Sequence, residues 1–212
     1  MTLLRTVCNS YLVNSYILAA ENKEAVLIDP ACCDEQQCSR MVEAVEQNQF
    51  KIVHILITHP HADHVMGTQM LKSAFPDATI MMHKEGLETY LQANDYALLM
   101  GFKKMSNIPP IDEYIVDNQE IKLSNLTLKI LYTPGHAPGS VSIFCPQGNL
   151  VFTGDVLFKE SIGRTDLAGG DFQTLKNMIY NKLFTLGEDT TVLPGHGDKT
   201  TIGHEKQFNP FL

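Results

Sequence analysis

The stretch ITHPHADH (residues 57–64) places three histidines and one aspartate within six positions at the end of an apolar run. Side chains two apart in an extended chain point the same way, and a residue before proline is held extended, so His59 and His61 should share a face. The chain then turns into a predicted helix, which would swing Asp63 and His64 towards a second position. The four side chains therefore predict ligands for two neighbouring cations.

Three other predicted strands end in the same kind of residue. LYTPGH ends at His136, TVLPGH ends at His196, and VFTGD ends at Asp155. We expect His136 to complete the first ligand set, His196 to complete the second, and Asp155 to bridge the two ions. Seven such ligands leave a position on each ion for a shared water, which is typical of a catalytic rather than a structural site. Histidine with aspartate suits zinc and also accepts iron or manganese.

The remaining histidines carry no assignment. A single histidine in a protein is more often a core or rim residue than a ligand, and His54, His83 and His204 stand apart from the motifs above.

The composition predicts one globular domain over residues 1–212, with 44% hydrophobic and 19% charged residues. A formal charge of -8, from 16 basic and 24 acidic residues, disfavours nucleic-acid binding. No apolar stretch approaches the ~18 residues that a membrane helix requires. The five cysteines are odd in number and contain no C-x-x-C pair or disulfide framework, so we expect unpaired cysteines and a cytoplasmic protein.

Strands and helices are interspersed along the chain, which favours a layered α/β sandwich. Hydrophobic patterning predicts strands over residues 6–20, 25–29, 51–58, 78–83, 119–123, 126–132, 141–145, 149–153 and 190–193. It predicts helices over residues 34–47, with Asp34 as the cap, and over 64–75, 171–184 and 203–208.

The segment 85–111 has two interpretations. Leu87, Leu91, Leu98 and Phe102 recur at helical spacing, and the prolines of NIPPI end the pattern. The favoured interpretation is a surface helix that turns this stripe to the core, and the alternative is a lid over the site.

These motifs resemble the metallo-β-lactamase superfamily and, within it, the glyoxalase II (hydroxyacylglutathione hydrolase) branch. The similarity runs through NSYIL, AVLIDP, THPHADH, TPGHAPGS, FTGDVLF, IGRTDLAGGD, PGHGDKTTIGHE and the NPF ending. It implies an αβ/βα four-layer sandwich with a two-metal site at the edge between the sheets. The implied ligands are His59, His61 and His136 on one metal, Asp63, His64 and His196 on the other, and Asp155 as the bridge. Asp29 matches the family's strand-end aspartate, which contacts the ligands rather than the metal and supports the local structure.

Full-length glyoxalase II enzymes continue into a C-terminal helical domain that contacts glutathione, whereas this chain stops at Leu212. It therefore resembles the short, single-domain bacterial form.

The expected reaction is hydrolysis of a thioester, S-D-lactoylglutathione or a related hydroxyacyl thioester, by a hydroxide shared between the ions. The ions contribute +4 against -2 from Asp63 and Asp155, which favours an anionic tetrahedral intermediate. Asp63 is the candidate for taking the proton of the next water. Arg164 pairs either with a substrate carboxylate or with Asp166 or Asp171. The expected partner is a small-molecule thioester, and we expect neither a nucleic acid nor a membrane as a partner. The protein itself is expected to be a monomer or a homodimer.

Two other activities remain open. HADH and GRTD also resemble persulfide dioxygenases, in which a single iron would use His59, His136 and Asp155. The second ligand set around His196 favours the hydrolase. Lactone or β-lactam hydrolysis would be the same chemistry on a different acyl group. A non-enzymatic metal-binding module would be expected to close its coordination shell, unlike this one.

Overall fold

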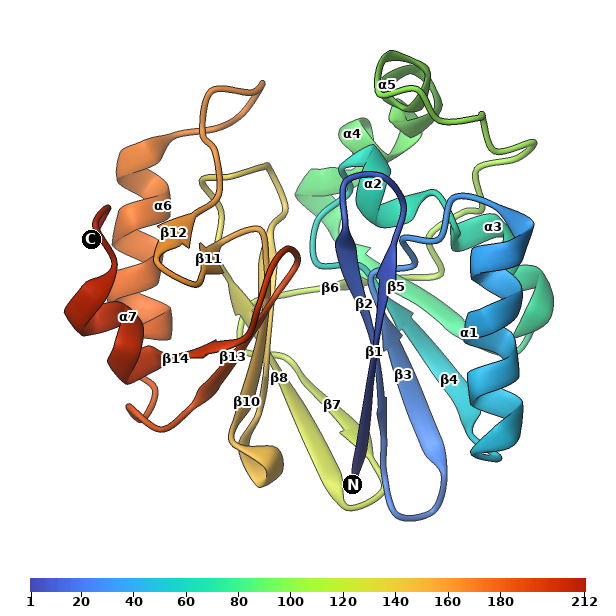
Figure 1. Cartoon of the computed structure of the whole chain (residues 1–212), viewed down its shortest axis with the longest axis horizontal. Coiled ribbons are helices and arrows are strands. Elements are labelled where there is room, and N and C mark those ends of the chain that lie inside the picture. The colour runs from blue at the N-terminus through green and yellow to red at the C-terminus, as the bar shows by residue number, and fades with distance from the viewer.

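The computed structural model describes all 212 residues and contains two six-stranded sheets that face each other, with helices outside them (Figure 1). The first sheet contains, in spatial order, β1 (Thr2–Cys8), β2 (Val13–Ala19), β3 (Glu24–Ile28), β4 (Lys51–Leu56), β5 (Thr79–His83) and β6 (Glu113–Ile115). The second contains β14 (Thr200–Thr201), β13 (Thr191–Pro194), β10 (Leu150–Gly154), β9 (Val141–Cys145), β8 (Leu126–Tyr132) and β7 (Glu120–Leu123). The predicted four-layer αβ/βα sandwich is confirmed.

Helices cover the outer face of each sheet. On the side of the first sheet these are α1 (Glu35–Gln47), α2 (Ala62–Val65), α3 (Thr68–Ala74), α4 (Leu87–Leu91) and α5 (Ala93–Leu99), and on the side of the second they are α6 (Phe172–Met178) and α7 (Ile202–Phe208). A small ribbon of β11 (Leu157–Phe158) and β12 (Ser161–Ile162) follows β10. Figure 1 shows α2, α4 and α5 beyond one end of the first sheet.

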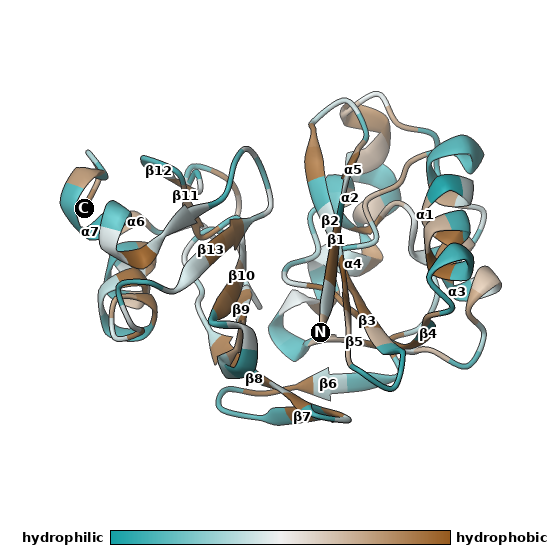
Figure 2. Cartoon of the chain, turned by 60° about the horizontal axis from the view of Figure 1, so that its bottom comes forward, coloured by the Kyte–Doolittle hydropathy of each residue, from teal (hydrophilic) through white to brown (hydrophobic).

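Three buried apolar clusters separate the four layers. Strand β2 is buried along its whole length and contributes to two of them, because successive side chains point to opposite faces. Tyr16 and Leu18 belong to the cluster between the sheets, and Ile17 and Ala19 belong to the cluster beneath α1 and α3. The third cluster lies between the second sheet and α6. Figure 2 shows this pattern as brown strands inside and teal residues on the outward helices.

The strand directions bring distant parts of the chain to one edge. Strands β3 to β6 run parallel, β10 is parallel to β13, and β8 has the same direction because both β8 and β10 are antiparallel to β9. The carboxyl ends of β3, β4, β8, β10 and β13 therefore meet at the edge that carries α2 in Figure 1.

Helix α1 confirms the prediction for residues 34–47. The side chain of Asp34 accepts a hydrogen bond from the backbone nitrogen of Gln37, which satisfies one free donor of the first turn. Cys38, Met41 and Val45 form the buried face.

The prediction of one strand over residues 6–20 was wrong. Two strands, β1 and β2, are joined by the turn Asn9–Leu12, in which Asn9 and Leu12 have positive φ of 50° and 58°. The side chain of Asn9 accepts a hydrogen bond from the backbone nitrogen of Tyr11, so this asparagine forms a local turn inside an apolar run.

The prediction of one helix over residues 64–75 was also wrong. The helix begins earlier, at Ala62, and breaks at Gly67, whose nitrogen donates to the carbonyl oxygen of Pro30. A Cβ at Gly67 would lie 2.4 Å from the Sγ atom of Cys32, so this close approach needs glycine and interrupts the helix.

The segment 85–102 buries only part of the predicted stripe, since Phe102 is buried and Leu87 packs against the cluster beneath α1 and α3. It forms two short helices, α4 and α5, in which Leu91 and Leu98 are 61% and 55% exposed. Tyr90, Ala93 and Ala97 are buried instead, because two small residues and one ring at i, i+3 and i+7 fit this tight surface.

Several short elements escaped prediction. Strands β6, β11, β12 and β14 contain two or three residues each, which is too short for a period to be recognised. The predicted helix over residues 171–184 is α6 followed by a π-helical turn, Ile179–Leu183.

The expectation of unpaired cysteines was wrong, since Cys32 and Cys38 form a disulfide. Cys8, Cys33 and Cys145 are free. A separation of six residues is not a recognised disulfide signal, and the pair meets only because α1 turns Cys38 back towards the loop before the helix. None of the helices has the length and apolar composition that a membrane crossing needs.

Candidate metal centre

All seven predicted ligand residues meet at this edge. Three groups have all their ligand atoms within 4.8 Å of one another: His59, His61 and His136; Asp63, His64 and His196; and His59, His64 and Asp155. The first two groups are the two predicted sets, and the third joins one member of each set to the predicted bridge.

Each side chain is delivered by the end of a strand or the helix that follows it. His59 and His61 follow β4, Asp63 and His64 lie in α2, and His136, Asp155 and His196 follow β8, β10 and β13. The cluster is largely buried, and its most accessible members are His61, which is half-buried, and His196, whose side chain is 26% exposed. A small molecule can therefore reach the cluster where these two histidines are exposed.

Asp29 fixes the orientation of two histidines. Its carboxylate accepts hydrogen bonds from the nitrogen and the hydroxyl of Thr58, each at 2.8 Å, and lies 3.0 Å from Nδ1 of His64. A carboxylate only accepts, so Nδ1 of His64 carries the proton. Thr58 donates to Asp29 and can accept from Nδ1 of His59 at 3.2 Å. Both His59 and His64 therefore turn their Nε2 atoms into the cluster.

Backbone carbonyls orient two more histidines in the same way. Nδ1 of His136 donates to the carbonyl oxygen of Arg164 at 2.7 Å, and Nδ1 of His196 donates to that of Tyr11 at 2.8 Å. The Nε2 atom of His136 then lies 3.0 Å from Nδ1 of His61. Four histidines thus direct their Nε2 atoms, rather than Nδ1, into one small volume.

Two buried atoms in this volume have no hydrogen-bond partner, Nε2 of His59 and Oδ1 of Asp155. Leaving a buried lone pair or a carboxylate oxygen unsatisfied costs free energy, and a cation between these atoms would satisfy both. The histidine and aspartate groups therefore fit a divalent metal site.

The cluster is also strongly coupled electrostatically. Burial, and then the neighbouring His64, lower the pKa of His59 well below its ordinary value. Burial alone would lower the pKa of His64, but Asp155 and Asp63 raise it well above that value. Burial opposes ionisation of Asp155, yet His64 and His196 hold its pKa well below the usual range. A divalent cation competes with the protons of these histidines, so metal binding is coupled to proton release.

The structure also identifies supporting residues that sequence reasoning missed. Thr58 lies inside the opening motif, but only its contacts to Asp29 and His59 show its role. Asn9 donates from Nδ2 to the carbonyl oxygens of Ala31 and Asp63. No local pattern could connect Asn9 to a residue 54 positions away.

Arg164 forms the ion pair that was one of its two interpretations. Its Nε and a terminal nitrogen donate to the two oxygens of Asp166 at 2.7 and 2.8 Å, on the exposed surface. Asp171 instead caps α6, where it accepts from the nitrogen of Thr174. The unassigned histidines, His54, His83 and His204, lie outside the cluster.

Replacing Asp29 with asparagine should weaken metal binding by about 10- to 100-fold, as loss of a ligand's hydrogen-bond partner typically does. The amide would turn a donor towards Nδ1 of His64 or the hydroxyl of Thr58, and one of these bonds would be lost. Zinc affinity measured by competition with a chromogenic chelator tests this. Asp34→Asn is the matched control, because asparagine caps a helix as well as aspartate does. Equal zinc affinity in the two variants would contradict the role of Asp29.

Comparison with known proteins agrees with this fold and site. Residues 5–196 match the family model described as "Metallo-beta-lactamase superfamily". The chain belongs to the metallo-β-lactamase superfamily. A hydroxyacylglutathione hydrolase, GloC, from Haemophilus influenzae is 34% identical over 94% of this chain and 92% of its own length.

Three solved structures are similar over nearly the whole chain. The BLEG-1 B3 metallo-β-lactamase superposes with a TM-score of 0.90 at 33% identity, covering 100% of this chain and 99% of that one. TTHA1623 in a di-iron-bound form superposes with a TM-score of 0.88 at 32% identity, covering 99% of this chain and 100% of that one. ETHE1 from Myxococcus xanthus superposes with a TM-score of 0.80 at 27% identity, covering 99% of this chain and 84% of that one. These neighbours support a metallo-hydrolase with a divalent metal site, and the di-iron form shows that the fold is not restricted to zinc.

Proposed function

We propose that the protein is a dinuclear metal hydrolase that cleaves a hydroxyacyl thioester, S-D-lactoylglutathione or a close relative, with zinc as the resident metal. The observation that carries this proposal is the convergence of two ligand sets on one buried volume that is open on the side of His61 and His196. The similarity to a hydroxyacylglutathione hydrolase supports the choice of substrate.

The proposed ligands are the seven residues of the cluster: His59, His61 and His136 for one ion, Asp63, His64 and His196 for the other, and Asp155 between them. Asp155 suits the bridging position because its Oδ2 lies 3.7 Å from Nε2 of His136 and 3.3 Å from Nε2 of His196, which belong to different sets. When bound, two divalent cations lower the pKa of a coordinated water towards ~7 and polarise a carbonyl group.

The chain's own groups would perform the remaining steps. Asp63 lies 3.5 Å from Nε2 of His196 and, as a carboxylate near the open side, can take up the proton that an attacking water loses. The carbonyl oxygens of Arg164 and Tyr11 and the carboxylate of Asp29 contact the Nδ1 atoms of His136, His196 and His64. The three rings are therefore already oriented and do not need to reorganise during the reaction. A thiol with a pKa of about 8.5 leaves as thiolate, so no separate general acid is required.

Arg164 is the proposed anchor for a substrate carboxylate. Its guanidinium is exposed and already paired with Asp166, so a substrate would compete for it. Arg164→Ala is therefore expected to raise KM several-fold with little change in kcat, and Asp166→Asn is expected to lower KM. Steady-state kinetics on both variants test the assignment, and unchanged KM values would remove the anchoring role.

The decisive experiment is metal quantification on the purified protein together with rates on S-D-lactoylglutathione. About two equivalents of zinc with rapid, metal-dependent hydrolysis would support the proposal. A single iron with oxygen uptake on glutathione persulfide would identify a dioxygenase. The similarity to ETHE1 is the observation that favours this alternative. Faster turnover of a lactone or β-lactam than of the thioester would keep the chemistry and change the substrate.

A further inference from the structure

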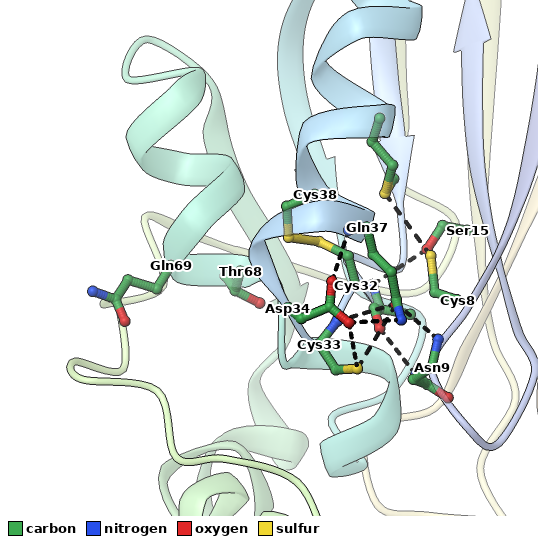
Figure 3. Close-up of a disulfide and its surroundings, with 12 residues drawn as sticks. Cys8, Asn9, Ser15, Cys32, Cys33, Asp34, Gln37, Cys38, Thr68 and Gln69 are labelled. Atoms are coloured by element: carbon green, nitrogen blue, oxygen red, sulfur yellow. Dashed lines mark hydrogen bonds between the residues drawn. A yellow bond between two sulfur atoms is a disulfide. The ribbon is translucent and has the colours of Figure 1, made fainter.

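The Cys32–Cys38 disulfide joins the loop that follows β3 to the first turn of α1 (Figure 3). Cys32 comes three residues after Asp29 in the loop between β3 and α1, and Cys38 lies near the start of α1. The two cysteines are 0% and 5% exposed. The bond therefore ties the loop that carries Asp29 to the helix.

This loop holds a conformation that its surroundings must enforce. Asp29 has a φ of 54°, in the left-handed region that a side chain other than glycine adopts at a cost. Asn9 joins the loop to the ligand helix α2 by donating to the carbonyl oxygens of Ala31 and Asp63, at 2.9 and 2.8 Å. A shift of the loop would therefore reach both Asp29 and a ligand residue.

The sulfur of Cys32 is a further point of contact between the loop and the ligand helix. The nitrogen of Gly67, just after α2, donates to the carbonyl oxygen of Pro30 at 2.8 Å. A Cβ at Gly67 would lie only 2.4 Å from Sγ of Cys32, so this sulfur packs directly on the backbone there. The disulfide holds that sulfur in place from the side of α1.

The other half of the bond, Cys38, borders a surface cavity. Cys38 lines a cavity of about 480 Å³ together with residues of α1 and α3, including Ser39, Gln69 and Met70. This volume is in the range of small-molecule sites. Cys38 is 5% exposed and lines this cavity, whereas Cys32 is 0% exposed, so Cys38 is the half of the disulfide that a small thiol would approach.

We propose that Cys32–Cys38 is an exchange site for low-molecular-weight thiols, and that its redox state sets how firmly the metal centre holds its ions. A thiolate attacks Sγ of Cys38, forms a mixed disulfide there, and releases Cys32 as a thiolate that takes up a proton. A second thiolate attacks the small-molecule sulfur of the mixed disulfide and releases Cys38, which is also protonated. In sum, two thiols become one small-molecule disulfide, and the protein gains two electrons and two protons.

Opening the bond removes the covalent restraint on the loop. Asp29 can then relax from its left-handed conformation, and His64 and Thr58 lose a fixed partner. The reduced protein is expected to release zinc about 10-fold faster, the lower end of what loss of a ligand's supporting contact costs. This coupling rests on the metal centre of the proposed function, whose reaction would itself release a compound of the thiol class.

The experiment follows sulfur and metal separately. Zinc-loaded protein is equilibrated in mixtures of reduced and oxidised glutathione, desalted, and divided. One part is alkylated under denaturing conditions and weighed by mass spectrometry, with three modified cysteines expected for the oxidised form and five for the reduced form. The other part is mixed with a chromogenic chelator, and the rate of zinc loss is expected to follow the fraction reduced.

Variants separate the disulfide from other effects of thiols on zinc. The double variant Cys32→Ser, Cys38→Ser should lose zinc at the fast rate in every mixture. Cys33→Ser is the matched control, because the Cys33 thiol contacts Asp34 rather than the disulfide, and burial and then Asp34 raise its pKa, so it is a poor nucleophile. In Cys33→Ser, the rate of zinc loss should follow the fraction of reduced disulfide as it does in the wild type.

Two results would overturn the proposal: five modified cysteines in every mixture, or equal rates of zinc loss from the oxidised and reduced wild type. The wild-type comparison decides even where the double variant fails to fold. If zinc retention depends on redox state but no thioester is hydrolysed, the proposed activity fails while this inference stands.

Discussion

Replacing Asp155 with asparagine is expected to reduce both metal content and hydrolysis by more than about 100-fold, because even indirect partners of a ligand contribute 10- to 100-fold to metal affinity. The carboxylate is buried, its Oδ1 lies 3.4 Å from Nε2 of His64, and its Oδ2 faces His136 and His196. Removing the charge leaves the histidines of both sets without their common anion. Metal content by mass spectrometry and the rate with saturating zinc measure the effect.

The matched control is Asp189→Asn, which makes the same chemical change at an exposed turn before β13, at the opposite end of that strand from His196. It should keep wild-type metal content and rate. If Asp155→Asn retained both zinc ions and wild-type turnover, Asp155 would not bridge the ions.

The second large effect is expected from Gly195→Ala. A Cβ at this position would lie 2.3 Å from Oδ1 of Asp155 and 2.8 Å from Cε1 of His64, so both side chains would have to move. A displacement of about 1 Å at a catalytic group can reduce the rate by about 100-fold. Overpacking of this kind also destabilises the fold by about 1–3 kcal/mol. Zinc affinity, turnover and thermal unfolding would each be measured.

Gly187→Ala provides the comparison. Its Cβ would meet only the hydroxyl oxygen of Thr190, at an ordinary 3.7 Å, and its φ is not in the left-handed region. Wild-type behaviour of Gly187→Ala together with loss of zinc in Gly195→Ala would locate the effect at the cluster. If Gly195→Ala bound zinc and turned over normally, the packing of Asp155 and His64 described here would be wrong.

The long, periodic elements could be predicted because their patterns are local. The apolar face of α1 repeats at helical spacing behind the Asp34 cap, and β4 and β8 are long enough for a strand pattern. The turn at Asn9–Leu12 and the break at Gly67 could not be predicted. One depends on an asparagine that bonds within its own turn, and the other on contacts with Pro30 and Cys32, which are far away in the sequence.

The same division applies to the site. The sequence alone determined the family resemblance and the seven candidate ligands, because strand-end motifs such as Pro-Gly-His carry the ligand type and the turn chemistry in a few adjacent residues. The resemblance also pointed to Asp29 as a supporting residue, but only the tertiary structure decided which rings it orients. Asp29 contacts His64 and, through Thr58, His59, whereas the carbonyl oxygens of Arg164 and Tyr11 orient His136 and His196. It also decided the pairing of Cys32 with Cys38. A hydrogen bond or a disulfide requires two groups to meet in space, and here that meeting depends on how the sheets and helices pack rather than on any local pattern.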